Sequence, residues 1–425
     1  MYEDGVDGES LREVLQKACK HVDIGAAVLP KALLCPDIDE HDTGSREGVA
    51  PEETVSTSVT RYARTLSREF NAVVVEHHLK WAPLCVSEPG PLQDEIPCSR
   101  LGRYDFHHAD SVVDWAIKHN MKVKGHVLVW HVTSPSFLEE MTPDEVWEQL
   151  RRHIFTTMGH YRGRIKVWDV VNESLAPDGT LAKNVFYRKL GPSYIEQSFR
   201  WAHEADPDAI LLYNDNKVEG MDGPNKKKAD GFYRLLADLV KRSVPVHGCG
   251  IQAHFNAAGV GKNRPPTPRM VKNQIHRLGE LGLSVNISEM DVRVSQLEPK
   301  LRQIAQRQIY RDIIAAALTE PSFDGIWLWG FTDRHTWVTH FYYDDEPLIF
   351  DDQYCRKEAF YGLREALSTL TVGGVVGAHV PLDTDTDEEG NSWGHEWMRP
   401  DQNSDETATR TEAESGESKP DWLLS

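Results

Sequence analysis

The chain of 425 residues contains few cysteines, and none of them is spaced for a metal or redox site. Its six cysteines are scattered without a Cys-x-x-Cys pair, which argues against a zinc knuckle and against a dithiol redox site. We therefore expect no bound metal and no cofactor. Cys85 and Cys98 flank one predicted loop, so they are the candidates for a disulfide if the protein resides in an oxidising compartment.

The sequence also lacks a long apolar run and an export signal. No stretch approaches the ~20 apolar residues that a membrane-spanning helix needs, so we expect no membrane partner. The first ten residues, MYEDGVDGES, are acidic and polar, without the basic and apolar regions of a signal peptide. We expect an extracellular location only if a leader has been removed, and a cytoplasmic one otherwise.

Basic residues are outnumbered by acidic ones, 47 to 66, which leaves a formal net charge of −19. Thirteen of the acidic residues lie in Val380–Ser425 together with only three Lys or Arg. An acidic chain without a basic stripe argues against nucleic acid as a partner. We expect a neutral or small ligand instead, and a monomer.

Short apolar runs alternate with longer segments of helical period through most of the chain. This alternation is typical of a parallel sheet whose strands are joined by helices. The eight runs that we assign to strands are Ile24–Val28, Ala72–Val75, Val123–Val129, Ile165–Val171, Ile210–Tyr213, Gly250–Ala253, Ser284–Ser288 and Gly325–Leu328. Eight such strands predict an α/β fold with a single closed (β/α)8 TIM barrel.

The composition changes sharply near residue 371, and this change sets the predicted domain boundaries. Residues 1–23 are expected to form an N-terminal extension with a short helix over Ser10–His21, and residues 24–370 a single barrel domain. Residues 371–425 are rich in Asp, Glu, Ser and Thr and poor in periodic apolar residues. Such a composition is typical of disorder, so we predict a disordered acidic tail.

Two of the expected helices carry clear start signals. Thr142-Pro143-Asp144-Glu145 reads as a capping box with proline at the first helical position. Thr267-Pro268 opens a second helix in the same way. Both signals stand just before residues of helical period, so we expect a helix to begin at each proline.

Two of the strand candidates end abruptly on carboxylates. Asn172 and Glu173 follow the run Ile165–Val171, and Glu289 follows the run Ser284–Ser288. Because a barrel of parallel strands keeps its reactive groups at the carboxyl ends of the strands, we expect both carboxylates at one mouth of the barrel. Two carboxylates are what acid-assisted cleavage of a glycosidic bond requires.

Polar and indole side chains follow most of the other strands as well. Those that we single out are Lys80, His126, Trp130, Asn214, Gln252, His254, Asp291, Trp329 and Trp337. Sugars present hydroxyl edges and apolar faces, so this mixture of polar and aromatic groups suits an oligosaccharide cleft. One polar strand end is more often structural, but polar ends on most of the strands favour a binding site.

Eight short motifs stand in an order that matches one enzyme family. They are HLKWAPL, MKVKGHVLVWH, VWDVVNE, LLYNDN, GIQAHF, ISEMDV, WLWGFTDRHTW and PLIFDDQY. The chain thereby resembles glycoside hydrolase family 10, the endo-1,4-β-xylanases, over roughly Asp23–Leu370. The resemblance implies hydrolysis of internal β-1,4-xylosidic bonds in xylan or xylo-oligosaccharides by a retaining double displacement.

The resemblance also implies roles for individual residues. Glu173 would be the general acid/base and Glu289 the nucleophile, while Asn172 would hold the hydroxyl next to the reacting carbon. The residues that it places around the sugar on the glycone side are Lys80, His126, Trp130, Gln252, His254, Trp329 and Trp337. Asp291 and His254 would keep Glu289 charged, and Asn214 would support the site. We expect Asp169 only to orient its neighbours.

The two catalytic carboxyl groups must hold opposite protonation states. Glu173 must carry a proton to donate to the leaving oxygen, so we expect burial and the charge of Glu289 to raise its pKa. Glu289 must be ionised to attack, so we expect donors such as His254 and Gln252 to keep its pKa low.

One position departs from the family's pattern. Where the family usually has Glu-Asn ahead of the Lys-Trp pair, this chain has Glu76 and His77. That asparagine normally helps to bind the second sugar of the glycone side. We therefore expect Glu76 and His77 to contact substrate, with altered recognition of the second sugar.

Two other functions share parts of this pattern. A related barrel β-glucanase would have the same carboxylate pair and would differ in admitting the hydroxymethyl group that glucose has and xylose lacks. A catalytically inactive carbohydrate-binding protein would be expected to have lost one of the two carboxylates, whereas both Glu173 and Glu289 are present.

Overall fold

The computed structural model describes residues 8–18, 22–35, 59–86, 103–221, 223–259 and 265–370. Cys98 and the acidic tail, residues 371–425, lie outside these ranges. The disulfide between Cys85 and Cys98 and the disorder of the tail therefore stay predictions.

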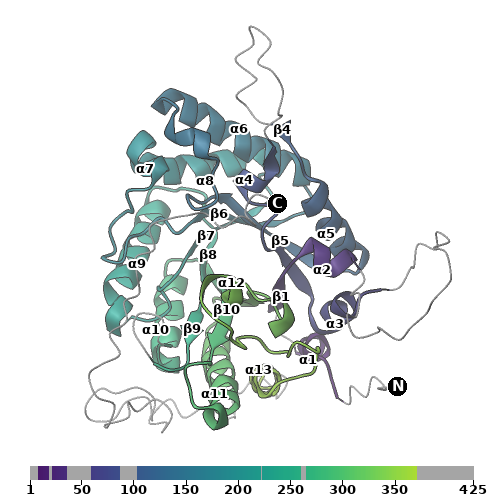
Figure 1. Cartoon of the computed structure of the whole chain (residues 1–425). Coiled ribbons are helices and arrows are strands. Elements are labelled where there is room, and N and C mark those ends of the chain that lie inside the picture. The colour runs from purple at the N-terminus through teal and green to yellow at the C-terminus, as the bar shows by residue number, and fades with distance from the viewer. Residues whose placement is uncertain are drawn as a thin grey trace, which may run out of the picture.

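Eight parallel strands form a closed barrel, with the helices packed around it (Figure 1). The strands are β1 (Asp23–Val28), β2 (Ala72–Val75), β5 (Lys122–Val129), β6 (Val167–Asn172), β7 (Ile210–Asp215), β8 (Gly248–Ile251), β10 (Ser284–Arg293) and β11 (Phe323–Leu328). The ring closes because β11 pairs in parallel with both β10 and β1. The predicted TIM barrel is confirmed.

Strand β10 is longer than predicted, since it continues past Ser288 to Arg293. Its second half pairs with a short strand, β9 (His254–Asn256), that follows β8 along the chain. Glu289 therefore lies within a strand rather than after one. A further pair of short strands, β3 (Cys85–Val86) and β4 (Arg103–Tyr104), is antiparallel and lies outside the barrel sheet.

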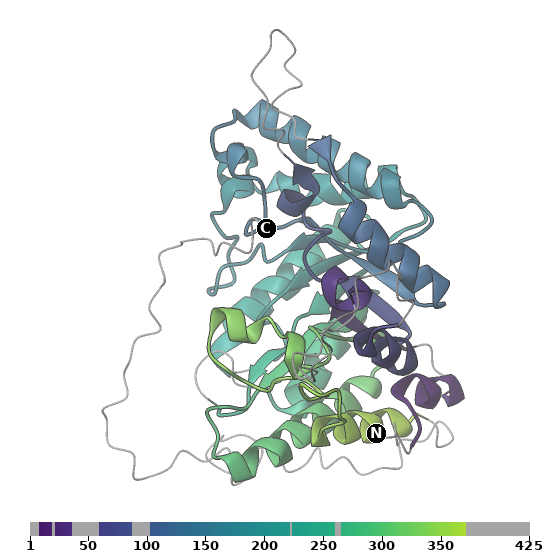
Figure 2. The same ribbon diagram turned by 45° about the vertical axis from the view of Figure 1, so that its right-hand side comes forward.

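The helices alternate with the strands along the chain. They are α1 (Leu11–Lys17), α2 (Pro30–Leu34), α3 (Arg61–Glu69), α4 (Trp81–Leu84), α5 (His107–Lys118), α6 (Pro143–Tyr161), α7 (Val185–Leu190), α8 (Ser193–Ala205), α9 (Lys226–Lys241), α10 (Pro268–Gly279), α11 (Pro299–Leu318), α12 (Val338–Phe341) and α13 (Glu358–Ser368). Figure 2 shows α11 and α13 lying side by side. None of the helices described combines the length and the apolar character needed to cross a membrane.

The predicted helix starts are confirmed. The Thr142 side chain accepts a hydrogen bond from the Glu145 amide, and the Glu145 carboxylate accepts one from the Thr142 amide. Thr267 caps α10 in a similar way, through its contact with the Met270 amide. These caps satisfy backbone donors that a helix leaves without partners in its first turn.

The barrel interior is filled by side chains whose fit depends on small neighbours. Gly25 on β1 lies opposite Trp327 on β11, and a Cβ atom added at Gly25 would lie 2.1 Å from the Trp327 ring. Trp327 packs with Ala27, Ala72 and other buried residues of the neighbouring strands. The indole thus occupies space that only a glycine at position 25 leaves open.

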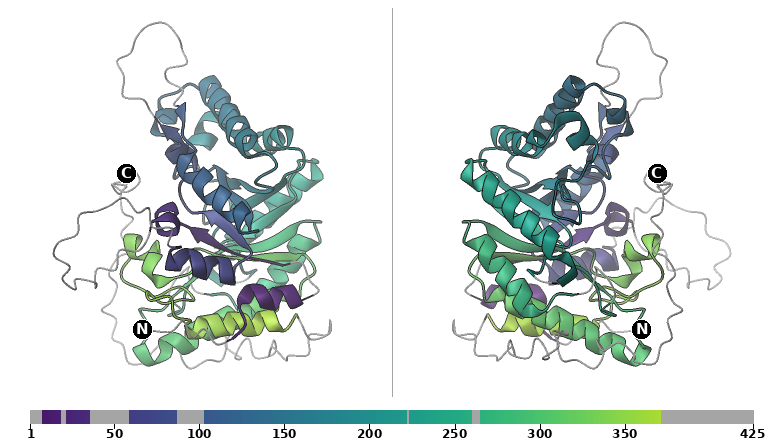
Figure 3. Two further views of the ribbon diagram at one scale, coloured as in Figure 1. Left: turned by 90° about the vertical axis from the view of Figure 1, so that its right-hand side faces the viewer. Right: turned by 90° about the vertical axis from the view of Figure 1, so that its left-hand side faces the viewer.

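The N-terminal helix α1 packs on the barrel, next to α13 and α3 (Figure 3). Its residues Leu11, Val14 and Leu15 are buried. The Leu11 amide also donates a hydrogen bond of 3.0 Å to the Glu69 carboxylate at the end of α3. The division of the chain at residues 23 and 370 remains a prediction.

Candidate active site

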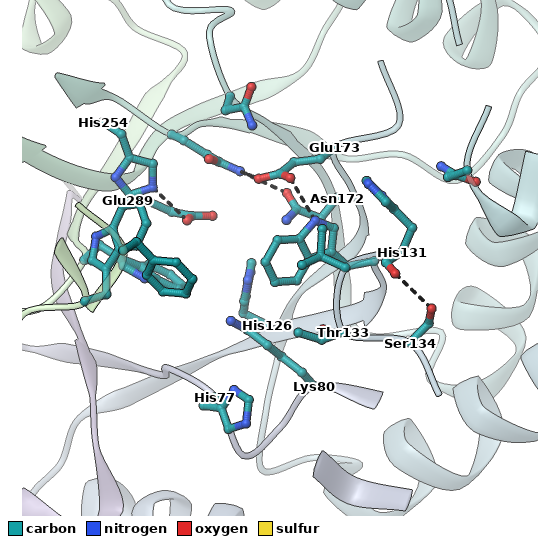
Figure 4. Close-up of a pocket in the computed structure, with 18 of the residues that line it drawn as sticks. His77, Lys80, His126, His131, Thr133, Ser134, Asn172, Glu173, His254 and Glu289 are labelled. Carbon is teal, nitrogen blue, oxygen red and sulfur yellow. Dashed lines mark hydrogen bonds and ion pairs between the residues drawn. The ribbon is translucent and has the colours of Figure 1, made fainter. Parts of the chain in front are cut away.

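A cavity of about 830 Å³ opens at the carboxyl ends of the barrel strands. Its volume falls in the range usual for small-molecule binding sites. All the residues predicted as catalytic or substrate-binding line it, namely Glu76, His77, Lys80, His126, Trp130, Asn172, Glu173, Gln252, His254, Glu289, Trp329 and Trp337. Figure 4 shows Glu173 and Asn172 on one side of the cavity and Glu289 with His254 on the other, with Lys80 and His126 below them.

Glu173 follows the last residue of β6 in a left-handed backbone conformation, with φ of 51°. Such a conformation is uncommon for a residue other than glycine, and it recurs at functional sites. The Glu173 amide donates to the Asn214 carbonyl, which holds this turn against β7. The carboxylate accepts hydrogen bonds of 2.9 Å from both Trp130 Nε1 and Gln252 Nε2. Each of its oxygens therefore has a defined donor.

Glu289 is 5% exposed, on the inner side of β10. Its Oε1 accepts a hydrogen bond of 2.6 Å from Asn214 Nδ2, and its Oε2 lies 3.2 Å from His254 Nε2. Burial by itself would raise the pKa of Glu289, but the His254 hydrogen bond and the charges of His126, His254 and Lys124 lower it to about 2. The carboxylate is thus ionised at neutral pH, as predicted.

His254 carries the charge that acts on Glu289. Its Nδ1 lies 2.7 Å from the Asp291 carboxylate, and Trp337 Nε1 donates to the same carboxylate oxygen at 2.8 Å. Burial would lower the pKa of His254, yet Asp291 and Glu289 together raise it to about 10. Asp291 and His254 are thus in direct contact, as the predicted support of the Glu289 charge requires.

The Gln252 carbonyl accepts a hydrogen bond of 3.0 Å from the Glu289 amide, but the Gln252 side chain does not donate to the Glu289 carboxylate. This corrects the prediction that the side chain helps to hold that charge. Instead, its Nε2 atom donates to Glu173 and, at 3.2 Å, to Asn172 Oδ1. Asn172 Oδ1 also accepts from Asn214 Nδ2 at 3.0 Å, and Asn214 in turn reaches Glu289. One network of amides therefore connects the two carboxylates and fixes their orientation.

A buried charged cluster supports the floor of the cavity. Asp169 is 1% exposed, and its Oδ2 lies 2.9 Å from His126 Nδ1 and 3.0 Å from Lys124 Nζ. Asp169 thus fixes the orientation of the His126 ring through this contact. Lys124 is a residue that our prediction missed. The sequence does contain a signal for it, because Lys124 interrupts the apolar run of β5. Lysine is almost never fully buried unless it is paired.

Lys80 and Glu76 share one wall of the cavity. The Lys80 ammonium lies 4.8 Å from the Trp130 ring centroid and 5.5 Å from that of Trp329. Burial lowers the pKa of Lys80, although the charges of Glu289, Glu76 and Glu173 oppose this. Burial raises the pKa of Glu76 to about 7, against the effect of the Lys80 charge.

His77 lies on the same side of the cavity as Lys80, apart from Glu173 and Glu289 (Figure 4). Burial, followed by the charges of Lys80 and His78, lowers the pKa of His77 to about 3. The imidazole is therefore neutral at neutral pH. A neutral imidazole can form hydrogen bonds but carries no charge into the cavity.

Several residues outside the predicted set also line the cavity. They include the loop Thr133–Ser136, the Glu139–Arg188 ion pair, Glu219, Arg293 and Tyr342. Arg293 lies on the same strand as Glu289 and Asp291, at the alternating positions that share a face. That spacing was available in the sequence, but it has meaning only once the strand is known to extend to Arg293. In the described part of the chain, no cluster of His, Cys, Asp and Glu is arranged to hold a metal ion.

Two carboxylates with separate donors at the carboxyl end of a (β/α)8 barrel are typical of barrel glycosidases. The comparisons with known proteins agree with this class. Residues 40–366 match the model of glycosyl hydrolase family 10. The chain therefore belongs to glycosyl hydrolase family 10.

Similar proteins are xylanases by name. An endo-1,4-β-xylanase B from Thermotoga neapolitana is 36% identical over 312 residues, which cover 72% of this chain and 83% of that protein. A β-1,4-xylanase from Dictyoglomus thermophilum is 35% identical, covering 72% and 84%. The crystal structure of xylanase 10B from Thermotoga petrophila RKU-1 with xylobiose superposes with a TM-score of 0.70 at 32% identity, covering 85% of this chain and 98% of that one.

Proposed function

We propose that this protein is an endo-1,4-β-xylanase that hydrolyses internal bonds of xylan and xylo-oligosaccharides with net retention of configuration. The observation that carries the proposal is the difference between the surroundings of the two carboxylates. Glu289 lies against the cationic His254 and is ionised, whereas Glu173 lies against the neutral donors Trp130 and Gln252. Membership of a retaining family supports the same assignment.

In the proposed mechanism Glu289 attacks the anomeric carbon of the bound xylose and forms a glycosyl-enzyme. Glu173 gives its proton to the oxygen of the departing sugar in the same step. Glu173 then removes a proton from the water that attacks the anomeric carbon and releases Glu289. Two inversions at this carbon leave its configuration unchanged.

We propose that the other polar residues bind the reacting sugar and its neighbours. Asn172 is held by Asn214 and Gln252 in a fixed orientation beside Glu173, which suits a contact with the hydroxyl next to the reacting carbon. Trp329 and Trp337 would pack against sugar faces, and Lys80 and His126 would meet hydroxyl groups. Asp169, Asp291 and Asn214 would position these groups without touching the substrate.

Product analysis tests the proposal. The protein is incubated with unsubstituted xylan, arabinoxylan and cellulose, and the products are separated by chromatography. Xylo-oligosaccharides of several lengths should appear early from both xylans, as endo-cleavage requires, and cellulose should remain intact. Comparable release from cellulose would favour a β-glucanase, and no release from any polymer would favour a binding protein.

We also propose that the protein acts as a monomer and binds neither nucleic acid nor membranes. The support is its excess of acidic residues and the absence of a basic stripe in the sequence. Sedimentation velocity at several protein concentrations would test the oligomeric state. A sedimentation coefficient that rises with concentration would contradict the monomer.

A further inference from the structure

Arg293 is a buried cation at the wall of the cavity. It lies on β10 four residues beyond Glu289, and it is 5% exposed. Its guanidinium lies 4.3 Å from the centroid of the Tyr342 ring. Among the residues that the structure describes, this guanidinium forms neither a hydrogen bond nor an ion pair.

Two other cations in or beneath the cavity have carboxylate partners, whereas the Lys80 ammonium contacts the rings of Trp130 and Trp329. Arg188 is paired with Glu139 at the rim, and Lys124 is paired with Asp169 beneath the cavity. Glu219, a further carboxylate of the cavity wall, accepts hydrogen bonds from two backbone amides and lies beyond ion-pair distance of Arg293. Because a buried guanidinium is costly without an acceptor, the donors of Arg293 are suited to a ligand that brings one.

An aromatic wall runs from the reacting centre toward Arg293. The ring of Trp337, whose indole nitrogen binds Asp291, lies 5.5 Å from the ring of Phe341 and 5.7 Å from that of Tyr342. Tyr342 is 50% exposed and lines the cavity. Such rings suit the apolar faces of sugars.

The position of Arg293 along β10 separates its backbone from that of Glu289. Four residues of extended chain span about 13 Å. The guanidinium would therefore meet a sugar or a branch beside the xylose that reacts, rather than that xylose itself. Plain xylan is neutral, so an anionic group at this place has to come from a substituent of the polymer.

We propose that Arg293 and Tyr342 form a binding site for a carboxylate-bearing branch, so that xylan substituted with uronic acid is the preferred substrate. This inference rests on the proposed xylanase function. The planar guanidinium matches a carboxylate through two parallel hydrogen bonds. Tyr342 covers the face of the branch sugar and holds the guanidinium plane beneath it by cation–π contact.

Two xylo-oligosaccharides of equal length test the proposal. One carries a single glucuronic acid branch, and the other is the same compound after reduction of its carboxyl group to a neutral alcohol. They differ only in the anionic group, so the ratio of their kcat/KM values isolates its recognition. The wild-type protein should favour the acidic compound by about 10-fold or more, the scale of a charge-assisted hydrogen bond.

Substitutions at Arg293 should change this ratio in a graded way. Arg293→Gln should bring it near one, while Arg293→Lys should keep part of the preference because it keeps the charge but not the planar geometry. Arg188→Gln is the matched control, since it removes an arginine of the same cavity that already has a carboxylate partner. It should change kcat/KM for both compounds by a similar factor.

Two results would overturn the inference. One is that the wild-type protein cleaves both compounds equally well. The other is that Arg293→Gln lowers kcat/KM by the same factor for both compounds. A third oligosaccharide without any branch reports separately on the proposed function. If the wild-type protein leaves that compound intact as well, the xylanase assignment itself has failed.

Discussion

At the scale of single residues, the charge of Glu289 depends on Asp291, which it does not touch. Asp291 holds the proton on His254, and His254 in turn lowers the pKa of Glu289 to about 2. The proposed mechanism needs Glu289 in its ionised form, so activity should fall as the pH drops through the pKa of Glu289. In the wild-type protein that fall lies well below neutral pH.

Replacing Asp291 should move the acid limb of the pH profile upward. In Asp291→Asn the imidazole of His254 loses its proton near neutral pH, so the pKa of Glu289 rises by about one unit or more. We expect the acid limb of kcat/KM on an aryl xyloside to move to higher pH by that amount. Asp345→Asn is the control, because Asp345 binds the amides of Val294 and Ser295 and none of these groups. If the acid limb of Asp291→Asn lies at the same pH as that of the wild-type protein, Asp291 does not act on Glu289 through His254.

The two catalytic assignments can be separated with one substrate. Glu173→Gln and Glu289→Gln should each lower xylan hydrolysis by at least ~10³-fold, since each removes a group that takes part in bond breaking in the proposed mechanism. On an aryl xyloside whose leaving group needs no proton, Glu173→Gln should accumulate a glycosyl-enzyme. Mass spectrometry should detect this adduct in Glu173→Gln only. An adduct in Glu289→Gln would contradict the nucleophile assignment.

His77 is expected to contribute a hydrogen bond without a charge. The low pKa of about 3 keeps its imidazole neutral through the working pH range. His77→Asn should therefore change the KM for short xylo-oligosaccharides by at most ~10-fold, the scale of one neutral hydrogen bond. The size of this change should be the same at pH 5 and pH 8. No change in any kinetic constant would mean that His77 does not contact the substrate.

The residues of the site differ in how far the sequence predicts them. Glu173 and Asn172 were identified because a buried apolar run ends on them. The partner of Gln252 could not be predicted, since Glu173 and Glu289 lie within reach of the same barrel mouth and only the geometry of the side chains decides between them. Arg293 was missed because nothing in its neighbours shows that β10 extends so far.

At the scale of strands and helices, apolar runs were sufficient to locate every strand of the barrel. Buried parallel strands read as continuous apolar segments, and this pattern does not depend on distant residues. The positions at which strands end, in contrast, do depend on distant residues. β10 continues to Arg293 because it pairs with β9, a contact that involves residues far apart in the sequence.

Two glycine substitutions should have opposite effects on stability. Gly25→Ala places a Cβ atom 2.1 Å from the Trp327 ring inside the barrel, so it should destabilise the protein by about 1–3 kcal/mol. Gly159→Ala is the matched change within helix α6, where the added Cβ meets nothing within 4 Å apart from its chain neighbours and the helix's own backbone. It should stabilise the helix by about 0.5–1 kcal/mol. Thermal unfolding should show a lower Tm for the first variant and a higher one for the second.

At the scale of the whole molecule, the barrel is closed by contacts between segments from both ends of the described chain. β1 pairs with β11, and α1 packs beside α13, near the last residue described. The boundary near residue 371 was predicted from composition alone. The contacts of α1 suggest that the first segment of the chain belongs with the barrel for its stability.

Two truncations should therefore differ in their effects. Removal of residues 371–425 should leave activity and Tm nearly unchanged, because all the barrel strands and the cavity precede this segment. Removal of residues 1–18 should lower the Tm by several degrees, because it exposes the apolar surface that Leu11, Val14 and Leu15 cover, and each buried side chain of this kind is worth about 1.5–3 kcal/mol. The cavity lies away from α1, so kcat/KM below the Tm should stay close to that of the full chain. Thermal unfolding and xylan hydrolysis should be measured on both variants. Loss of activity after removal of residues 371–425 would mean that part of the functional unit lies beyond residue 370.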